Sequence, residues 1–360
     1  MSFDKIIILI MAGFSIIGGL DRIFGNRLKL GTAFENGIKT MGELALSMIG
    51  IMVLAPVIAD LLAPVVVPVY RFLGADPAMF AGTILACDMG GAPLAGELTS
   101  DPAAAQLGGL ITGSMLGGTV SFTIPVAMST LTNEDRQYAA KGILCGVVTV
   151  PIGVILGGLV AGFPLKMILL NTLPILIVSL LIALGLWKAE KQLIKGFEIF
   201  GKCITALATV GIVAAGVELT IGYTLIPGLA SITEAFSVVG QIAIVLSGAF
   251  PLIAVLTRLL QKPFALAGEK LQINSTSVSG LMATLANSLA TFDMVKEMDP
   301  RGKIVNMAFA VSGAFVFGDH LAFTAGYDPT MIPALIVAKL SAGITAVILA
   351  LLISKEKNNV

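Results

Sequence analysis

The sequence has few charged side chains for its length. Only 12% of its 360 residues are charged, and mean hydropathy is +0.97. A soluble domain carries about 25% charged residues, so this composition is typical of a chain that faces lipid. Lys and Arg together number 22, as do Asp and Glu, so there is no net charge. With no basic stripe and no RNA- or DNA-binding module, the sequence predicts no nucleic-acid partner.

Cysteine, histidine and tryptophan are scarce as well. The chain has three cysteines, one histidine and one tryptophan. The cysteines lie inside apolar runs, and an odd number without extracellular spacing argues against a disulfide framework. A single histidine leaves no zinc constellation, so we predict no metal and no other cofactor. We find no nucleophile–base pair and no nucleotide-binding loop, which disfavours an enzyme.

Long apolar runs are abundant. A membrane-spanning helix needs about 20 mostly apolar residues. The segments that meet this length are 5–21, 41–63, 104–130, 140–162, 165–187, 197–218, 236–257, 304–327 and 330–353. The first is interpreted as a retained span, because it lacks a basic N-terminal region and a convincing cleavage site. We therefore predict an all-α polytopic membrane protein with about nine transmembrane helices.

Two further apolar segments contain helix breakers and polar groups. Asp88, Gly90 and Gly91 interrupt the first, and Asn287 and Ser288 interrupt the second. Such groups survive at membrane depth only where protein or a watery cavity surrounds them. We therefore predict two re-entrant hairpins, at 77–103 and 274–300.

The two halves of the chain carry the same landmarks in the same order, 195 residues apart at first and 198 apart later. The pairs are Pro56 and Pro251, Pro68 and Pro263, Gly82 and Gly280, Asp101 and Asp299, Ser114 and Ser312, and Lys141 and Lys339. A duplicated membrane unit with interrupted segments at matching positions is typical of secondary transporters. Within a single transport domain, 1–360, we expect a first repeat at 1–162, a linking span at 163–187 and a second repeat at 188–353.

Loop charges predict how the repeats are oriented, since cytoplasmic loops are enriched in Lys and Arg. The loops 22–39 and 188–202 are basic, whereas 219–235 has no basic residue. Basic residues flank the second hairpin on both sides, while acidic residues follow the first. The hairpins would thus enter from opposite faces, which makes the repeats inverted and suits alternating access. Eleven full spans with parallel repeats are the alternative.

Two carboxylates in apolar surroundings mark the candidate substrate site. Asp319 lies between Gly318 and His320, the only histidine in the chain. A carboxylate at a helix centre costs about 2.5–3.5 kcal/mol, so we expect Asp319 to face the protein interior. Gly318 can loosen the helix there, and His320 can donate, accept or titrate. The alternative is that Asp319 and His320 merely hydrogen-bond neighbouring helices.

The hairpin centres supply the other candidate ligands. Asp88, with Gly90 and Gly91 after it, can line a pocket or cap the hairpin tip. Asn287 and Ser288 are neutral donors and acceptors that could serve either purpose. We assign structural roles to the other residues that stand out. Glu97 and Asp293 are expected at the mouths of the hairpins, and Glu43 and Glu218 at the membrane interface. Lys141 and Lys339 are expected to snorkel to the surface rather than to pair with a carboxylate, and an unwound segment is expected at Gly117, Gly118 and Thr119.

The candidate set combines carboxylates, an imidazole, amides and hydroxyls without a buried arginine. It therefore suits a small cation that carries a hydroxyl, because carboxylates bind ammonium groups through charge-assisted hydrogen bonds. Tyr327 is the one tyrosine near the site, so there is no aromatic cage, and a primary amine is favoured over a quaternary ammonium.

Several motifs along the whole chain resemble the ethanolamine utilisation permease family, EutH. They are Phe80-Ala81-Gly82-Thr83, Cys87-Asp88-Met89-Gly90-Gly91, Leu225-Ile226-Pro227-Gly228-Leu229, Ala283-Thr284-Leu285-Ala286-Asn287, Arg301-Gly302-Lys303 and Gly318-Asp319-His320. The resemblance implies a multi-pass protein of the bacterial inner membrane that moves ethanolamine inward. Rival hypotheses are a channel-like facilitator of neutral ethanolamine or ammonia, and a membrane anchor that does not transport. The coupling ion and any homo-oligomer are left open.

Overall fold

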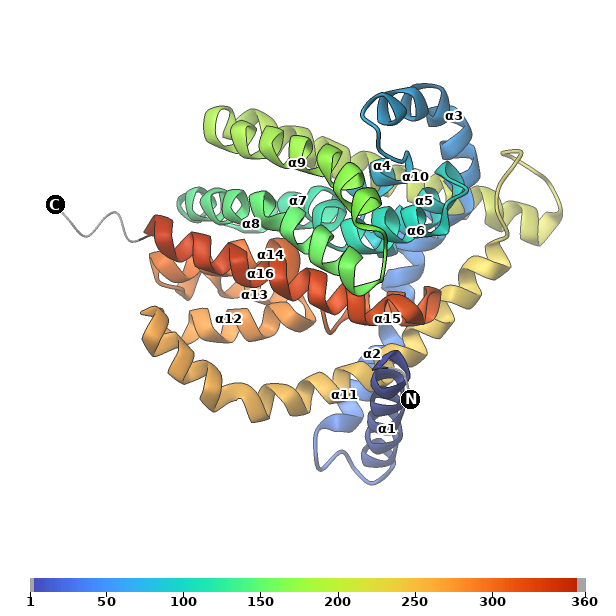
Figure 1. The fold of residues 1–360 in the computed structure, drawn as a ribbon. Helices are drawn as coiled ribbons and strands as arrows, with labels where there is room; N and C mark the ends of the chain where they lie inside the picture. The colour runs from blue at the N-terminus through green and yellow to red at the C-terminus, as the bar shows by residue number, and fades with distance from the viewer. Residues whose placement is uncertain (1–2, 355–360) are drawn as a thin grey trace.

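The computed structural model describes residues 3–354, except the side chain of Ala267, and every regular element in that range is helical (Figure 1). Eight helical stretches of the described chain are long and apolar enough to cross a membrane. They are Phe3–Ile23, Leu30–Phe72, Pro102–Thr130, Asn133–Val160, Leu165–Lys188, Glu190–Ile221, Ile232–Leu266 and Pro329–Ser354. The predicted all-α polytopic fold is therefore confirmed.

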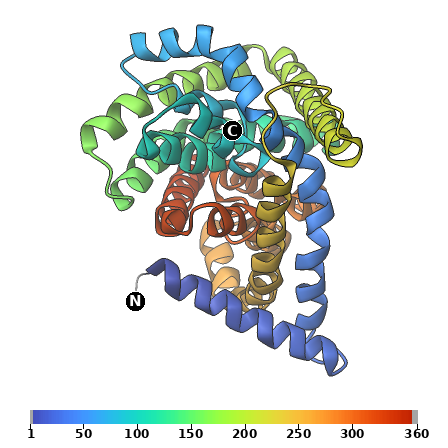
Figure 2. The same ribbon diagram turned by 90° about the vertical axis from the view of Figure 1, so that its right-hand side faces the viewer.

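The first half of the chain runs from α1 to α8. Its elements are α1 (Phe3–Ile23), α2 (Leu30–Leu44), η1 (Ala45–Ile49), α3 (Gly50–Phe72), α4 (Ala78–Ile84), η2 (Cys87–Met89), α5 (Gly91–Leu98), α6 (Pro102–Ala105), η3 (Gln106–Gly117), η4 (Thr119–Thr123), α7 (Ile124–Thr130) and α8 (Asn133–Val160). Seen at right angles to Figure 1, α1 lies along the lower edge of the molecule, where it contacts α2 and α11 (Figure 2).

The second half of the chain begins with the linking helix. Its elements are α9 (Leu165–Lys188), α10 (Glu190–Ile221), α11 (Ile232–Leu271), α12 (Ser275–Ala286), α13 (Ser288–Met294), η5 (Val295–Glu297), α14 (Pro300–Gly313), α15 (Asp319–Tyr327), η6 (Pro329–Met331) and α16 (Ile332–Ser354). In Figure 1, α8, α9 and α16 run side by side along the long direction of the molecule.

Both predicted hairpins form pairs of short helices whose bases are held by side-chain caps. Asp76 accepts hydrogen bonds from Ala78 N and Thr99 Oγ1 beside the first hairpin. Asn274, which lies 198 residues later, caps α12 by accepting from Ser277 N. The first hairpin lies to the right in Figure 1 and the second to the left, near the end of α16.

The predicted span 304–327 is not one helix. α14 ends at Gly313 and α15 begins at Asp319, which leaves residues 314–318 without helical hydrogen bonding. The N–H groups of Phe315 and Phe317 instead donate to carbonyl oxygens at the end of α12. Phe315 has a φ of 62°, a left-handed conformation that costs energy for a bulky residue. Contact with the second hairpin thus replaces the helical bonds that the sequence pattern predicted.

The prediction that residues 117–119 are unwound is wrong as well. The chain there remains helical but with the wider turns of a π-helix, in η3 and then η4. π-Helical turns are frequent at functional sites. They also allow very close packing: a Cβ on Gly82 of α4 would lie 1.8 Å from the carbonyl oxygen of Gly108 in η3. The helix after each hairpin therefore departs from α geometry near its middle.

Candidate functional site

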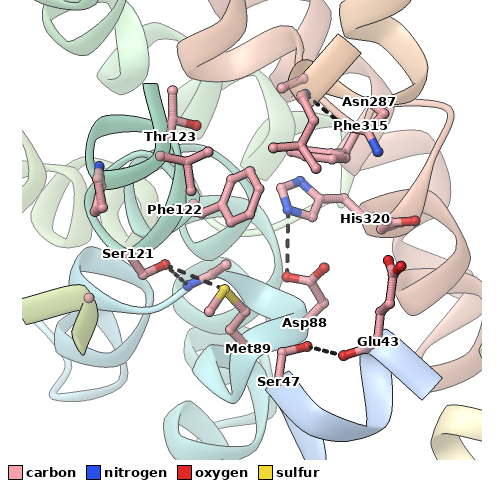
Figure 3. Close-up of a pocket in the computed structure, with 18 of the residues that line it drawn as sticks. Glu43, Ser47, Asp88, Met89, Ser121, Phe122, Thr123, Asn287, Phe315 and His320 are labelled. Carbon is pink, nitrogen blue, oxygen red and sulfur yellow. Dashed lines mark hydrogen bonds and ion pairs between the residues drawn. The ribbon is translucent and has the colours of Figure 1, made fainter. Parts of the chain in front are cut away.

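A cavity of about 750 Å³ lies between the two hairpin tips and the break before α15. In Figure 3, Asp88, Asn287 and His320 surround a common space, and the polar lining of the cavity includes residues from distant parts of the chain. They are Thr40, Glu43, Ser47, Asp88, Ser114, Ser121, Thr123, Ser129, Glu198, Lys202, Thr205, Asn287, Asp319 and His320. Phe122 and Phe315 form its aromatic wall, edge to face with ring centroids 5.7 Å apart.

Each predicted substrate-binding residue that lines the cavity lies where a helix begins or where the chain turns. Asp88 lies in η2 at the first hairpin tip and is 9% exposed. Asn287 joins α12 to α13 and caps α13, since its Oδ1 accepts from Leu289 N. Asp319 and His320 are the first two residues of α15. The site is therefore built from two hairpin tips and one helix start, where the chain turns inside the protein.

His320 connects the cavity to a buried lysine. Its Nε2 lies 3.6 Å from Asp88 Oδ1, and its Nδ1 lies 3.0 Å from Lys339 Nζ. Lys339 is completely buried, and Nζ also donates to the carbonyl oxygen of Ser114 at 2.5 Å. The prediction that Lys339 snorkels to the surface is therefore wrong. Its repeat mate, Lys141, is exposed.

Asp319 differs from Asp88 in its surroundings. Within residues 3–354, its carboxylate makes no hydrogen bond or ion pair with another side chain or with the backbone, although it is only partly exposed. Glu43 lines the same cavity and is exposed, whereas the sequence assigned it to the membrane interface. Three acidic residues, Glu43, Asp88 and Asp319, therefore line the cavity from α2, η2 and α15. Of these, Asp88 already faces His320.

Only some of the residues predicted to bind substrate line the cavity. Asp88, Asn287, Asp319 and His320 line the cavity, while four other predicted residues do not: Gly90, Gly91, Ser288 and Gly318. Gly90 has a φ of 92° and lies against Ile51, so a side chain there would collide. A Cβ on Gly318 would likewise collide with the carbonyl oxygen of Ala286. The buried hydroxyl of Ser288 has no hydrogen-bond partner among the described residues.

The residues predicted at the edge of the site lie away from it. Glu97 and Asp293 are exposed and do not line the cavity. Tyr327 does not line it either, because its ring stacks on Phe323. Phe122 and Phe315 supply the aromatic surface instead. Two rings on one wall do not enclose a ligand, so the cavity has no cage for a quaternary ammonium.

Sequence reasoning missed the roles of Glu43 and Lys339. Lys339 lies in the middle of the predicted span 330–353, and a charge at that depth usually has a partner inside the protein. This signal was present, but it did not identify His320 as the partner. Glu43 lies two residues inside the predicted span 41–63, where the pattern cannot distinguish a membrane interface from a cavity wall.

One group of side chains has the spacing of a metal site. Ligand atoms of Cys87, Asp88 and His320 all lie within 4.8 Å of one another. However, the ammonium of Lys339 is already 3.0 Å from the imidazole, and a second cation so close in a low-dielectric interior would be repelled. The thiol of Cys87 is fully buried and does not line the cavity. These residues therefore fit a resident ammonium better than a metal ion.

Comparison with known proteins identifies relatives over nearly the whole chain. A probable ethanolamine permease EutH of Listeria monocytogenes is 53% identical over 347 residues, which cover 96% of this chain and 93% of the relative. A probable ethanolamine permease EutH of Salmonella typhimurium is 44% identical over 391 residues, covering 98% and 96%. The uncharacterized protein YxeR of Bacillus subtilis is 46% identical over 346 residues, covering 96% and 94%.

No solved structure matches the chain significantly. The names of these relatives point to a transporter rather than an enzyme, in agreement with the apolar helices. The family profile described as ethanolamine utilisation protein, EutH, matches residues 3–353. The chain therefore belongs to the EutH family.

Proposed function

We propose that this protein is an ethanolamine permease of the bacterial cytoplasmic membrane. The observation that carries the proposal is the unpartnered carboxylate of Asp319 in a cavity bounded by both hairpin tips. The ammonium group of ethanolamine binds there, between Asp319 and Glu43 and within the negative potential of Asp88. The hydroxyl group contacts the Asn287 amide or the His320 imidazole.

The chemistry of the lining supports a small hydroxylated primary amine. An ammonium group has hydrogens to donate, and carboxylates are the strongest acceptors that a protein offers. A hydrogen bond to a charged group contributes about 1.5–3 kcal/mol net, and one inside a partly enclosed cavity is weakened little by salt. The Asn287 amide can both donate to and accept from a hydroxyl, so an amine without the hydroxyl should bind less tightly.

Alternating access is the transport mechanism that we infer. The first hairpin lies to the right and the second to the left in Figure 1, and the tips of both reach the cavity, which supports two oppositely inserted hairpins. The cavity extends to Glu198 and to the exposed Lys202, which lie in the first half of α10. The basic segment 188–202 was predicted to be a loop, but it is helical from Glu190 onward, so that prediction is wrong. The basic residues of this segment favour the cytoplasmic side, and we infer that this conformation is open to the cytoplasm. Movement of the first hairpin against the second would then expose Asp319 to the outside.

The rival function is a channel-like facilitator of neutral ethanolamine or ammonia. Counterflow in proteoliposomes distinguishes the two. We expect unlabelled ethanolamine inside the vesicles to accelerate uptake of labelled ethanolamine, because a carrier returns faster when loaded. Uptake should saturate, and choline, which has a quaternary ammonium, should compete poorly. Uptake that is linear in concentration and unaffected by internal ethanolamine would reject the carrier.

A further inference from the structure

Lys339 already places a primary ammonium beside the proposed site. It lies in α16 and is fully buried, at a depth where a charged side chain is costly and is usually functional. Among the described residues, its Nζ is hydrogen-bonded to two acceptors, Ser114 O and His320 Nδ1, although an ammonium can donate three hydrogen bonds. Neither acceptor is a carboxylate, so the charge has no direct counter-ion.

The imidazole of His320 links Lys339 to the cavity. A charged lysine can only donate, so Nδ1 must accept and a neutral His320 carries its proton on Nε2. This Nε2 points to Asp88 Oδ1 at 3.6 Å, which a small movement or one water molecule would bridge. A proton can therefore pass from Lys339, the donor, through His320 to Asp88, the acceptor. The last two of these residues line the cavity.

The acidic groups near Lys339, His320 and Asp88 can balance only a limited positive charge. Substrate binding adds a second ammonium within the same low-dielectric region, where like charges disfavour each other strongly. The titratable and charged groups that face the relay or share its cavity are Glu43 of α2, Cys87 and Asp88 of η2, Glu198 and Lys202 of α10, and Asp319 of α15. Of these, only Lys202 is basic, and it is exposed at the far end of the cavity.

We propose that Lys339, His320 and Asp88 form a proton relay, and that each ethanolammonium ion entering the cavity displaces one proton from Lys339. This inference rests on the permease function proposed above. It makes transport an exchange of one ammonium ion for one proton, so that each half-cycle carries one positive charge through the protein and the complete exchange is electroneutral.

The proton transfers balance without another reactant. Lys339 Nζ gives a proton to His320 Nδ1, while His320 Nε2 gives its proton to Asp88 Oδ1. Asp88 then releases the proton to water in the cavity, which leaves a neutral amine, a neutral imidazole in its other tautomer and a carboxylate. When ethanolammonium leaves on the opposite side, water on that side returns a proton through the same three groups in reverse.

Proteoliposomes with two matched gradients test the relay in the unmodified protein. A vesicle interior that is more acidic by one pH unit should drive about tenfold accumulation of ethanolamine by one-for-one exchange. A tenfold potassium gradient with valinomycin, inside negative, would drive about tenfold accumulation of a singly charged cation that moves alone, and we expect no such response. A response to the potential but not to the pH gradient overturns the relay.

Variants locate the proton on Lys339. We expect Lys339→Met to abolish the response to the pH gradient, while ethanolamine counterflow either persists or becomes sensitive to the potential. Lys141→Met, at the exposed repeat mate, should behave as the unmodified protein. His320→Gln interrupts the relay and also changes the lining of the proposed site. We therefore expect it to lose the response to the pH gradient and to raise the apparent KM for counterflow. A pH-gradient response that survives in both Lys339→Met and His320→Gln refutes the assignment.

Counterflow separates this inference from the permease function. If the unmodified protein shows no ethanolamine counterflow, the proposed function fails. If counterflow is present but no proton movement accompanies net uptake, measured with a pH-sensitive dye inside the vesicles, the relay alone fails.

Discussion

Replacing Asp319 by asparagine tests the proposed ammonium site most directly. Asp319→Asn keeps the shape of the side chain and removes its charge. A carboxylate and an ammonium 4 Å apart attract by about 4 kcal/mol at an effective dielectric constant of about 20. Both groups lose hydration when they meet, so the net contribution of such a charged hydrogen bond is about 1.5–3 kcal/mol. This corresponds to a loss of affinity of about ten- to a hundredfold.

The structure favours the lower part of that range and predicts no loss of stability. Glu43 and Asp88 line the same cavity and retain part of its negative potential. Asp319 makes no hydrogen bond within the described chain that asparagine would break, so the thermal midpoint in detergent should not change. Asp293→Asn is the matched control, because Asp293 is an exposed carboxylate outside the cavity.

The assay is the concentration dependence of ethanolamine counterflow. We expect the apparent KM to rise about tenfold or more in Asp319→Asn and to stay unchanged in Asp293→Asn. The reasoning would be refuted by an Asp319→Asn protein that has the KM of the unmodified protein. It would also be refuted if both variants were impaired equally, since a general surface potential would then explain the effect.

Other predictions concern the scaffold around the site. Lys303→Met should lower the free energy of unfolding by about 3 kcal/mol, because it leaves the buried carboxylate of Asp135 without its partner; thermal denaturation in detergent measures this. Gly82→Ala should prevent correct packing of the first hairpin, since the new Cβ would overlap a carbonyl oxygen of η3, and size-exclusion chromatography should show loss of monodisperse protein. If the repeats are inverted, Ser100→Cys should react with an impermeant maleimide from outside the cell and Glu297→Cys only from the cytoplasm.

Two of these experiments need a further variant of the same chain. Gly42→Ala adds a Cβ where nothing lies within 4 Å, so it should leave the chromatographic profile unchanged. The labelling experiment requires a Cys203→Ser background, because Cys203 is exposed whereas Cys87 and Cys145 are buried. Labelling of both introduced cysteines from one side would contradict the inverted repeats, and an unchanged midpoint in Lys303→Met would contradict a stabilising ion pair.

The membrane class and several residues of the cavity lining could be predicted because each depends on a strong local signal. A carboxylate such as Asp88 or Asp319 inside an apolar run has few tolerable environments, so its burial in protein follows from the sequence. Asn287 stood out for the same reason, as an amide within a segment too interrupted to span. These residues are 32 or more positions apart in sequence, yet the repeat pattern alone suggested that they would meet.

The break before α15 and the π-helical turns of η3 could not be predicted, because both result from contacts with other segments. The N–H groups of residues 315 and 317 satisfy their hydrogen bonds with the end of α12, an option that no local pattern reveals. In η3, the close approach of Gly108 to α4 depends on the shape of a neighbouring helix. Sequence periodicity describes a helix alone, and tertiary contacts changed its geometry in both places.

The difference between Lys141 and Lys339 shows that positions matched by the sequence pattern do not have matching surroundings. The two lysines occupy matching positions, yet Lys141 is exposed and Lys339 is buried against His320. The position equivalent to His320 in the first repeat, 198 residues earlier, is Phe122, which lines the cavity as an apolar wall. If the chain is a duplication, its two units both carry a hairpin, but the imidazole and the buried lysine occur in the second unit, whereas Asp88 of the first supplies the carboxylate that faces the imidazole. A second histidine–lysine pair at the matching positions would add a second ammonium beside the same cavity and would disfavour a cationic substrate.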